Sequence, residues 1–179
     1  GALTVNKRNL LIQTDDDDKP YDGTALSNNG WNIQIGSLAD NHYIVDVMTA
    51  TITNPSSAIN AIGITIYDNN NQDVSDYYSI TYDLGTLTVN PIVITLKSKS
   101  DSKIYDGTPL INSNWETIHG LLLPTHNINI VMGTEIVDVG TVENEIFAYV
   151  TDDQNNNVSS FYEFIYVAGK LTILSNTFL

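Results

Sequence analysis

The segment KPYDGTAL, from Lys19 to Leu26, recurs as KIYDGTPL, from Lys103 to Leu110, at a spacing of 84 residues. A shorter pattern, G-x-L-T, returns at the same spacing in GALTVN from Gly1, GTLTVN from Gly85 and GKLTI from Gly169. A shift of 84 residues aligns the chain with itself without a gap. Self-similarity at a fixed period indicates a repeat architecture, so we predict two copies of one module, residues 1–89 and 90–179.

Alternating apolar residues predict that each copy is built of β-strands. The segment NINIVMGTEI, from Asn127 to Ile136, places Ile128 and Ile130 on one face, as a half-buried strand does. Similar alternation marks residues 43–53, 62–66, 77–89, 145–150 and 161–173. No window of 12 residues shows helical periodicity.

These strands, separated by turn-rich segments, predict an all-β fold with about six strands per copy. We expect two tandem antiparallel β modules, each an Ig-like β-sandwich, with a helix-poor β-grasp-like module as the alternative. The segment GTLTVNPIVITLKSKS joins the copies without a Gly/Ser-rich or Pro-rich linker. A direct connection of this kind predicts that the modules follow one another end to end as a stiff array.

Composition limits the classes of function. The 179 residues include 21 acidic and 7 basic side chains, for a net charge of −14. Such a charge repels nucleic acids and anionic lipid surfaces, so we expect no nucleic-acid partner. Cysteine is absent, which excludes thiolate metal sites and cysteine nucleophiles. No run of about 18 apolar residues occurs, so we expect no membrane insertion in this segment.

The ordered motifs resemble those of the YDG-type tandem repeats, which are Ig-like or β-grasp-like modules of bacterial cell-surface proteins and adhesins. The shared pattern is K-x-Y-D-G-T-x-L, G-x-L with a nearby His, V-G-T-V-x-N-x-I, D-x(5)-V-S-x-x-Y and a closing G-x-L-T. In the second copy it comprises Lys103, Tyr105, Asp106, Gly107, Thr108, Leu110, Gly120, Leu122, His126, Val139, Gly140, Thr141, Val142, Asn144, Ile146, Asp152, Val158, Ser159, Tyr162, Gly169 and Leu171. The first copy departs from it at NPSSAINAI, residues 54–62.

This resemblance implies a secreted protein attached to the cell wall or surface, chiefly of Gram-positive bacteria. It implies structural or adhesive roles and no enzymatic activity.

Two kinds of acidic segment are candidates for calcium binding. The first is the run Asp15–Asp18, whose counterparts from Lys99 to Ser102 include a single acidic residue. Successive side chains of an extended segment point to opposite sides, so we interpret the run as solvated or edge-protecting charge. The second kind is the pair of loops at 68–76 and 152–160, which lack the spacing of an EF-hand and are interpreted as Asn/Asp-rich hairpin loops. Weak binding of Ca²⁺ remains the alternative for both.

The remaining candidates favour structural roles. In Tyr21-Asp22-Gly23 and its repeat, we expect Gly to supply a positive φ, Asp to start a turn and Tyr to pack. Trp31 and Trp115 recur in both copies, which favours core packing over a sugar-binding platform. His42 and His126 are single within each copy and have no nucleophile or metal-ligand partner in the pattern. We therefore predict no catalytic, cofactor-binding or metal-binding residue.

Lys19 and Lys103 are also candidates for a Lys–Asn isopeptide cross-link. Each lysine is followed directly by the YDG turn, and no Asn and Glu partners can be assigned. The sequence as a whole favours a non-enzymatic stalk repeat of an extracellular bacterial surface protein, monomeric, with neighbouring repeats of the same chain as its partners. The alternative is an adhesin module that itself binds a host glycan or protein.

Overall fold

The structure, a computed structural model, describes residues 1–176 and confirms the all-β fold. The chain divides into two compact units, called here unit 1 (Gly1–Asn90) and unit 2 (from Pro91 onward). The boundary lies one residue after the expected position, because Asn90 ends the last strand of unit 1 and its carbonyl accepts a hydrogen bond from the N–H of Tyr21 (2.7 Å).

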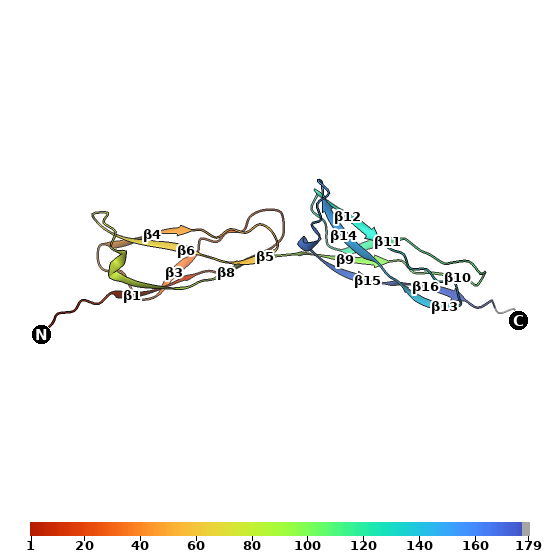
Figure 1. Ribbon diagram of the computed structural model, residues 1–179, viewed down its shortest axis with the longest axis horizontal. Helices are drawn as coiled ribbons and strands as arrows, with labels where there is room; N and C mark the ends of the chain where they lie inside the picture. The colour runs from red at the N-terminus through yellow and green to blue at the C-terminus, as the bar shows by residue number, and fades with distance from the viewer. Residues whose placement is uncertain (177–179) are drawn as a thin grey trace. The chain divides into compact units, whose positions relative to one another are not determined.

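Both units have the same order of strands (Figure 1). Unit 1 contains β1 (Arg8–Thr14), β2 (Asp17–Pro20), β3 (Trp31–Ile35), β4 (His42–Met48), β5 (Ser56–Ile59), β6 (Ile62–Asp68), the 3-10 turn η1 (Ser75–Tyr77), β7 (Tyr78–Asp83) and β8 (Thr86–Asn90). Unit 2 contains β9 (Ile92–Ser98), β10 (Asp101–Ile104), β11 (Trp115–His119), β12 (His126–Val131), β13 (Gly140–Asn144), β14 (Phe147–Asp152), the 3-10 turn η2 (Ser159–Phe161), β15 (Tyr162–Val167) and β16 (Gly169–Leu174).

Two of the three sheets in each unit are mixed, which differs from the antiparallel arrangement expected from the sequence. In unit 1 the sheets are β3-β1-β7, β2-β8-β5 and β4-β6, and unit 2 repeats them as β11-β9-β15, β10-β16-β13 and β12-β14. The pairs β1–β7 and β2–β8 are parallel, as are β9–β15 and β10–β16. The remaining pairs are antiparallel. Alternation along a strand does not reveal its partner, so the sequence could not show that the first and last strands of each unit pair in parallel.

Among the described residues each unit has eight strands, against the expected six. The segment expected at 77–89 is divided into β7 and β8 by an interruption at Leu84–Gly85, and a second interruption at Asp15–Asp16 separates β1 from β2. The two interruptions lie against each other: a Cβ on Gly85 would come within 2.4 Å of the carbonyl oxygen of Asp15. Only glycine permits this close approach of two backbones.

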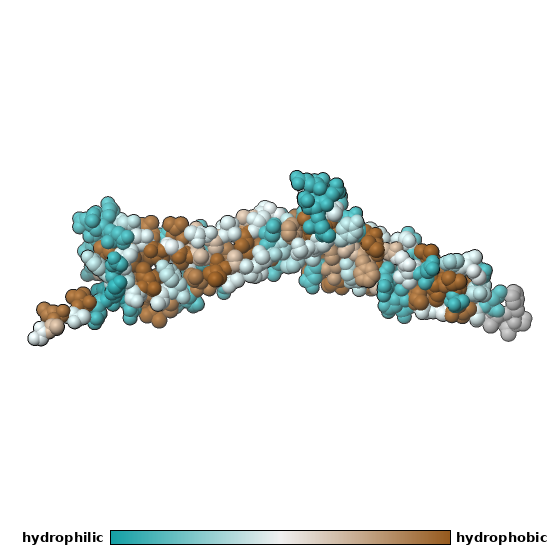
Figure 2. All heavy atoms as spheres, in the orientation of Figure 1, coloured by the Kyte–Doolittle hydropathy of each residue, from teal (hydrophilic) through white to brown (hydrophobic). Residues whose placement is uncertain are grey.

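Each unit has its own apolar core. In unit 1 the buried cluster is Leu10, Ile12, Ile66, Val74 and Tyr78, and in unit 2 it is Ile94, Leu96, Ile146, Val150, Val158 and Tyr162. A second group of buried side chains lies beyond the strand interruptions and includes Leu87, Val89, Leu171 and Ile173. Figure 2 shows apolar residues also reaching the viewed surface of both units.

Candidate functional site

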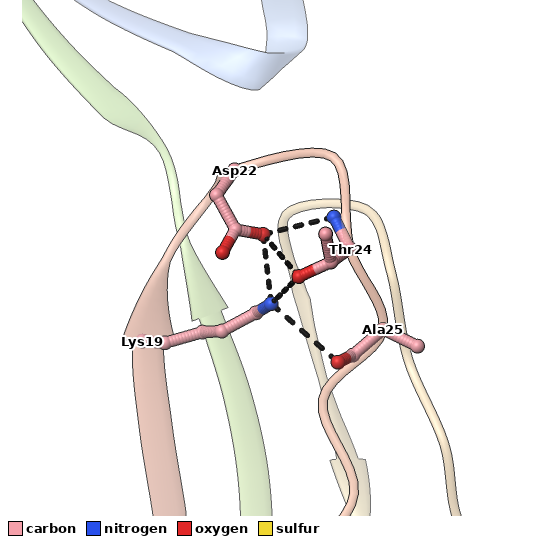
Figure 3. Close-up of polar contacts among 4 residues, drawn as sticks. All are labelled: Lys19, Asp22, Thr24 and Ala25. Carbon is pink, nitrogen blue, oxygen red and sulfur yellow. Dashed lines mark hydrogen bonds and ion pairs between the residues drawn. The ribbon is translucent and has the colours of Figure 1, made fainter.

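The repeated K-x-Y-D-G-T segment forms a closed polar cluster at the end of β2 (Figure 3). Lys19 Nζ donates to Asp22 Oδ1 (2.8 Å), to Thr24 Oγ1 (2.6 Å) and to the carbonyl of Ala25 (3.5 Å). The same Asp22 oxygen accepts hydrogen bonds from the N–H of Thr24 (2.8 Å) and from its hydroxyl (2.7 Å). Gly23, at φ 80°, supplies the left-handed backbone that the turn requires.

Unit 2 repeats this cluster with nearly identical geometry. Lys103 Nζ donates to Asp106 Oδ1 (2.8 Å), Thr108 Oγ1 (2.6 Å) and the carbonyl of Pro109 (3.2 Å), and Gly107 has φ 78°. The lysine hydrogen bond, followed by those from the threonine, holds the pKa of Asp22 and of Asp106 well below the usual range. Because these bonds occupy the ammonium group and the carboxylate, the cluster fits a structural turn better than a catalytic pair or an isopeptide donor.

The tyrosine of the motif lies in different environments in the two units. Tyr21 is 7% exposed, whereas Tyr105 is 41% exposed. Burial, with a smaller contribution from the charge of Asp22, raises the pKa of Tyr21. The prediction that the tyrosine packs therefore holds for Tyr21 and only partly for Tyr105.

The aspartate run begins in the interruption between β1 and β2 and continues into the edge strand β2 with Asp17 and Asp18. Asp16 Oδ1 accepts a hydrogen bond from the N–H of Thr86 (2.6 Å), and Asp18 Oδ2 accepts one from Asn90 Nδ2 (3.1 Å). Both bonds join the run to β8, the partner of β2. Within residues 1–176, no group of three or more His, Cys, Asp or Glu side chains is placed to hold a metal ion. Two carboxylates of the run are thus engaged with the neighbouring strand, and edge protection by the run stays a prediction.

The Asn/Asp-rich loops use their carboxylates to close the turn. Asp68 Oδ1 accepts the N–H groups of Asn70 (2.8 Å) and Gln72 (2.9 Å), and Asn71 between them has φ 59°. The hydrogen bond from the backbone N–H of Gln72 has the largest effect in lowering the pKa of Asp68. Asp152 accepts two backbone N–H groups in the same way in unit 2. The turn chemistry expected for Asn and Asp thus accounts for these loops.

A histidine–tyrosine pair occupies the same place in both units. His42 Nδ1 lies 2.7 Å from the hydroxyl of Tyr78, which also accepts the N–H of Ala39 (2.9 Å). His126 and Tyr162 form the same contact at 2.7 Å. Both tyrosines are buried, so the pair fixes the loop before β4 or β12 onto the core. The tryptophans likewise pack against the two cores, as their recurrence predicted.

A buried asparagine connects several segments in each unit: Asn144 belongs to the motif pattern, but the sequence analysis assigned no role to it or to its counterpart Asn60. Asn60 Nδ2 donates to the carbonyls of Asp15 (2.9 Å) and Asn28 (3.1 Å), and its N–H donates to the carbonyl of Gly85 (2.8 Å). Asn144 makes the same two side-chain bonds in unit 2, both at 2.9 Å. These residues connect the strand interruptions of each unit. The signal was present in the sequence, since both are Asn at the repeat spacing within otherwise divergent segments.

Sequence reasoning also missed an exposed aromatic surface on unit 2. Phe147 is 54% exposed and Tyr149 is 43% exposed, on the same outward face of β14. Alternation in EIFAYV places these two residues on the face opposite Ala148 and Val150, which was the available signal.

Comparison of the chain with protein-family models, with curated proteins and with solved structures finds no match. The resemblance to YDG-type repeats therefore depends on the motif residues alone. Across the described part of the chain, no helix has the length and apolar character needed to cross a membrane.

Proposed function

We propose that this chain is a pair of non-enzymatic, force-bearing spacer modules of a secreted bacterial surface protein, which project other domains of that protein away from the cell wall. The feature that supports this most is the parallel pairing of the terminal strands within each unit.

In unit 1 the parallel ladder runs from Arg8 opposite Tyr78 to Pro20 opposite Asn90. The chain therefore enters the unit at one end of this ladder and leaves it at the other. A force that separates the ends of the unit pulls the paired strands along their length, in shear. Under shear, the hydrogen bonds of a ladder bear the load together, whereas in peeling they break one after another. Unit 2 has the same arrangement in β9–β15 and β10–β16.

The side-chain chemistry also favours a structural role. The lysine, aspartate and threonine of each K-x-Y-D-G-T cluster are hydrogen-bonded to one another, and the buried tyrosine hydroxyls hold loops. A disulfide-free domain stabilised by apolar cores is compatible with an extracellular location. The resemblance to YDG-type repeats supports the surface location and the absence of enzymatic activity.

Single-molecule force spectroscopy tests the proposal. The chain has no cysteine, so introduced cysteines define the points of attachment. Lys7→Cys with Pro91→Cys loads unit 1 in shear, and we expect a several-fold higher unfolding force than for Lys7→Cys with Tyr77→Cys, which peels β1 from β7 starting at one end. Equal forces in the two geometries would contradict a force-bearing role.

The location is tested separately on the parent protein. We expect its full sequence to include a signal peptide, further repeats of the same period and a C-terminal sorting signal. A parent protein confined to the cytosol would contradict the proposal.

A further inference from the structure

The two units have the same fold but different sequences. A comparison of equivalent positions therefore shows which side chains the fold requires. Phe147 and Tyr149 on β14 correspond to Gly63 and Thr65 on β6. Since β6 forms the same pairing without either ring, the fold does not require them. Exposed aromatic rings that the fold can dispense with indicate a binding surface.

The ring of Phe147 is held in place by a neighbouring aromatic row. Tyr166 makes an edge contact with Phe147, with ring centroids 5.7 Å apart, and Phe164 stacks on Tyr166 at 5.9 Å and 9°. The Tyr166 hydroxyl accepts the N–H of Ala148 (3.1 Å), which attaches the row to β14. In unit 1 the position of Phe164 is occupied by Ile80. A ring that is braced before binding loses little conformational freedom when a ligand stacks on it.

Phe147 also borders a shallow hollow of about 360 Å³ on unit 2, lined by Val131, Gly133, Thr134, Glu145 and Phe147. The Thr134 hydroxyl accepts the backbone N–H of Glu145 (3.0 Å), so these two residues, which both line the hollow, lie side by side. The corresponding residues in unit 1 are Ala61 for Glu145 and Ala50 for Thr134. The ring, the carboxylate and the hydroxyl are thus all particular to unit 2.

We propose that this hollow binds a neutral pyranose unit of a glycan. One face of a pyranose presents C–H groups that pack on an aromatic ring, and its hydroxyls donate to carboxylates and exchange hydrogen bonds with other hydroxyls. Phe147 supplies the ring, with Tyr149 beside it, while Glu145 and Thr134 supply the polar groups. The volume lies within the range of small-ligand sites.

Charge selects neutral sugars over acidic ones. The chain has a net charge of −14, and the acidic residue Glu145 lines the hollow itself. A sialylated or sulfated sugar would meet repulsion both over the surface and at the contact. This binding role goes beyond that of a spacer and does not depend on it.

The test is a titration of the full chain with lactose, cellobiose and N-acetyllactosamine, followed by amide NMR shifts, with 3′-sialyllactose as the acidic comparison. We expect at least one neutral disaccharide to shift the amides of residues 131–134 and 145–149. Phe147→Ala and Glu145→Ala are each expected to weaken that binding about tenfold or more, the effect of losing one central contact.

Two variants serve as controls. Phe147→Leu keeps apolar contact with Tyr166 and is expected to fold while losing stacking, and the remaining amide spectrum reports whether it folds. Tyr77→Ala removes a ring that is 63% exposed on unit 1 and is expected to leave binding unchanged. Three results would overturn the site: no shift of these amides by any of the neutral disaccharides, unchanged binding by folded Phe147→Leu and Glu145→Ala, or equal binding of 3′-sialyllactose.

Discussion

At the scale of single residues, Asn60 and Asn144 have the most demanding positions in the molecule. Both are almost fully buried, at 0% and 1% exposure, yet each is polar. The side-chain nitrogen of each asparagine donates to backbone carbonyls of two different segments. These carbonyls lie outside the regular strand ladders, so the asparagine supplies the hydrogen bonds that a neighbouring strand would otherwise give. The Oδ1 atom of each amide is buried and accepts no hydrogen bond from the described residues, so the two bonds of the nitrogen must offset the desolvation of the whole group.

Replacing Asn60 is therefore expected to destabilise unit 1. Asn60→Ala removes both donors and should lower the free energy of unfolding by roughly 1–3 kcal/mol. Asn60→Asp should cost more at neutral pH, because a carboxylate would face two carbonyl oxygens. Urea denaturation measures both variants. The exposed neighbour Asn29→Ala serves as the control and should change stability by no more than about 0.5 kcal/mol; an Asn60→Asp variant as stable as the wild type would show that the amide is not needed.

At the scale of elements, the K-x-Y-D-G-T turn joins the end of β2 to the next segment through charge as well as backbone conformation. The turn is exposed, so its ion pair is screened by water and salt. Its effect on stability is best seen through pH, because the protonation of Asp22 and Asp106 removes the acceptor that all three donors share.

Both aspartates have a lowered pKa in the folded protein, so the folded state binds fewer protons than the unfolded state in the acid range. The two carboxylates stabilise the folded state at pH values above about 4, the pKa of an aspartate in the unfolded chain. This stabilisation is lost as the pH falls below that value. An Asp22→Asn/Asp106→Asn double variant should melt at a lower temperature than the wild type at pH 7.

The difference in melting temperature should narrow steadily from pH 4 towards pH 2. Other carboxylates with a lowered pKa, including Asp68, Asp73 and Asp152, are present in both proteins and cancel in the comparison. A difference that stayed constant across this range would mean that the turn acts through its backbone geometry alone.

At the scale of the whole molecule, the acidic chain raises the question of stabilisation by cations. The aspartates of the loops already accept backbone N–H groups, and the run on β2 is joined to β8. A ligand that binds only the folded state raises the melting temperature, and the rise grows with the logarithm of the ligand concentration once that concentration exceeds Kd.

We therefore expect the melting temperature of the chain to be the same, within about 1 °C, in EDTA and in millimolar calcium at fixed ionic strength, since 1 kcal/mol would shift a domain of this size by several degrees. Magnesium at the same concentration is the control for the non-specific screening of the acidic side chains by a divalent cation. A rise specific to calcium would contradict this expectation, and its loss in Asp16→Asn/Asp18→Asn would place the ion at β2.

Much of the fold could be predicted from local patterns. Alternation in segments such as Asn127–Ile136 reports which side chains face a core, and the glycine after Tyr-Asp reports a left-handed turn, because both depend on neighbouring residues only. The exposure of Phe147 could not be predicted in this way, since a ring on the second face of a strand is buried or exposed according to what covers that face.

The sequence by itself determined that the chain contains strands, that it repeats every 84 residues, and that the two copies share one fold. Only the tertiary structure decided that β1 pairs in parallel with β7, about 70 residues away, and that Asn60 and Gly85 meet at the interrupted strands. The physical reason is that side-chain period is a local property of the backbone, whereas strand partners and the covering of a face result from packing between distant segments. The proposed spacer role and the proposed sugar site both depend on that second, non-local level.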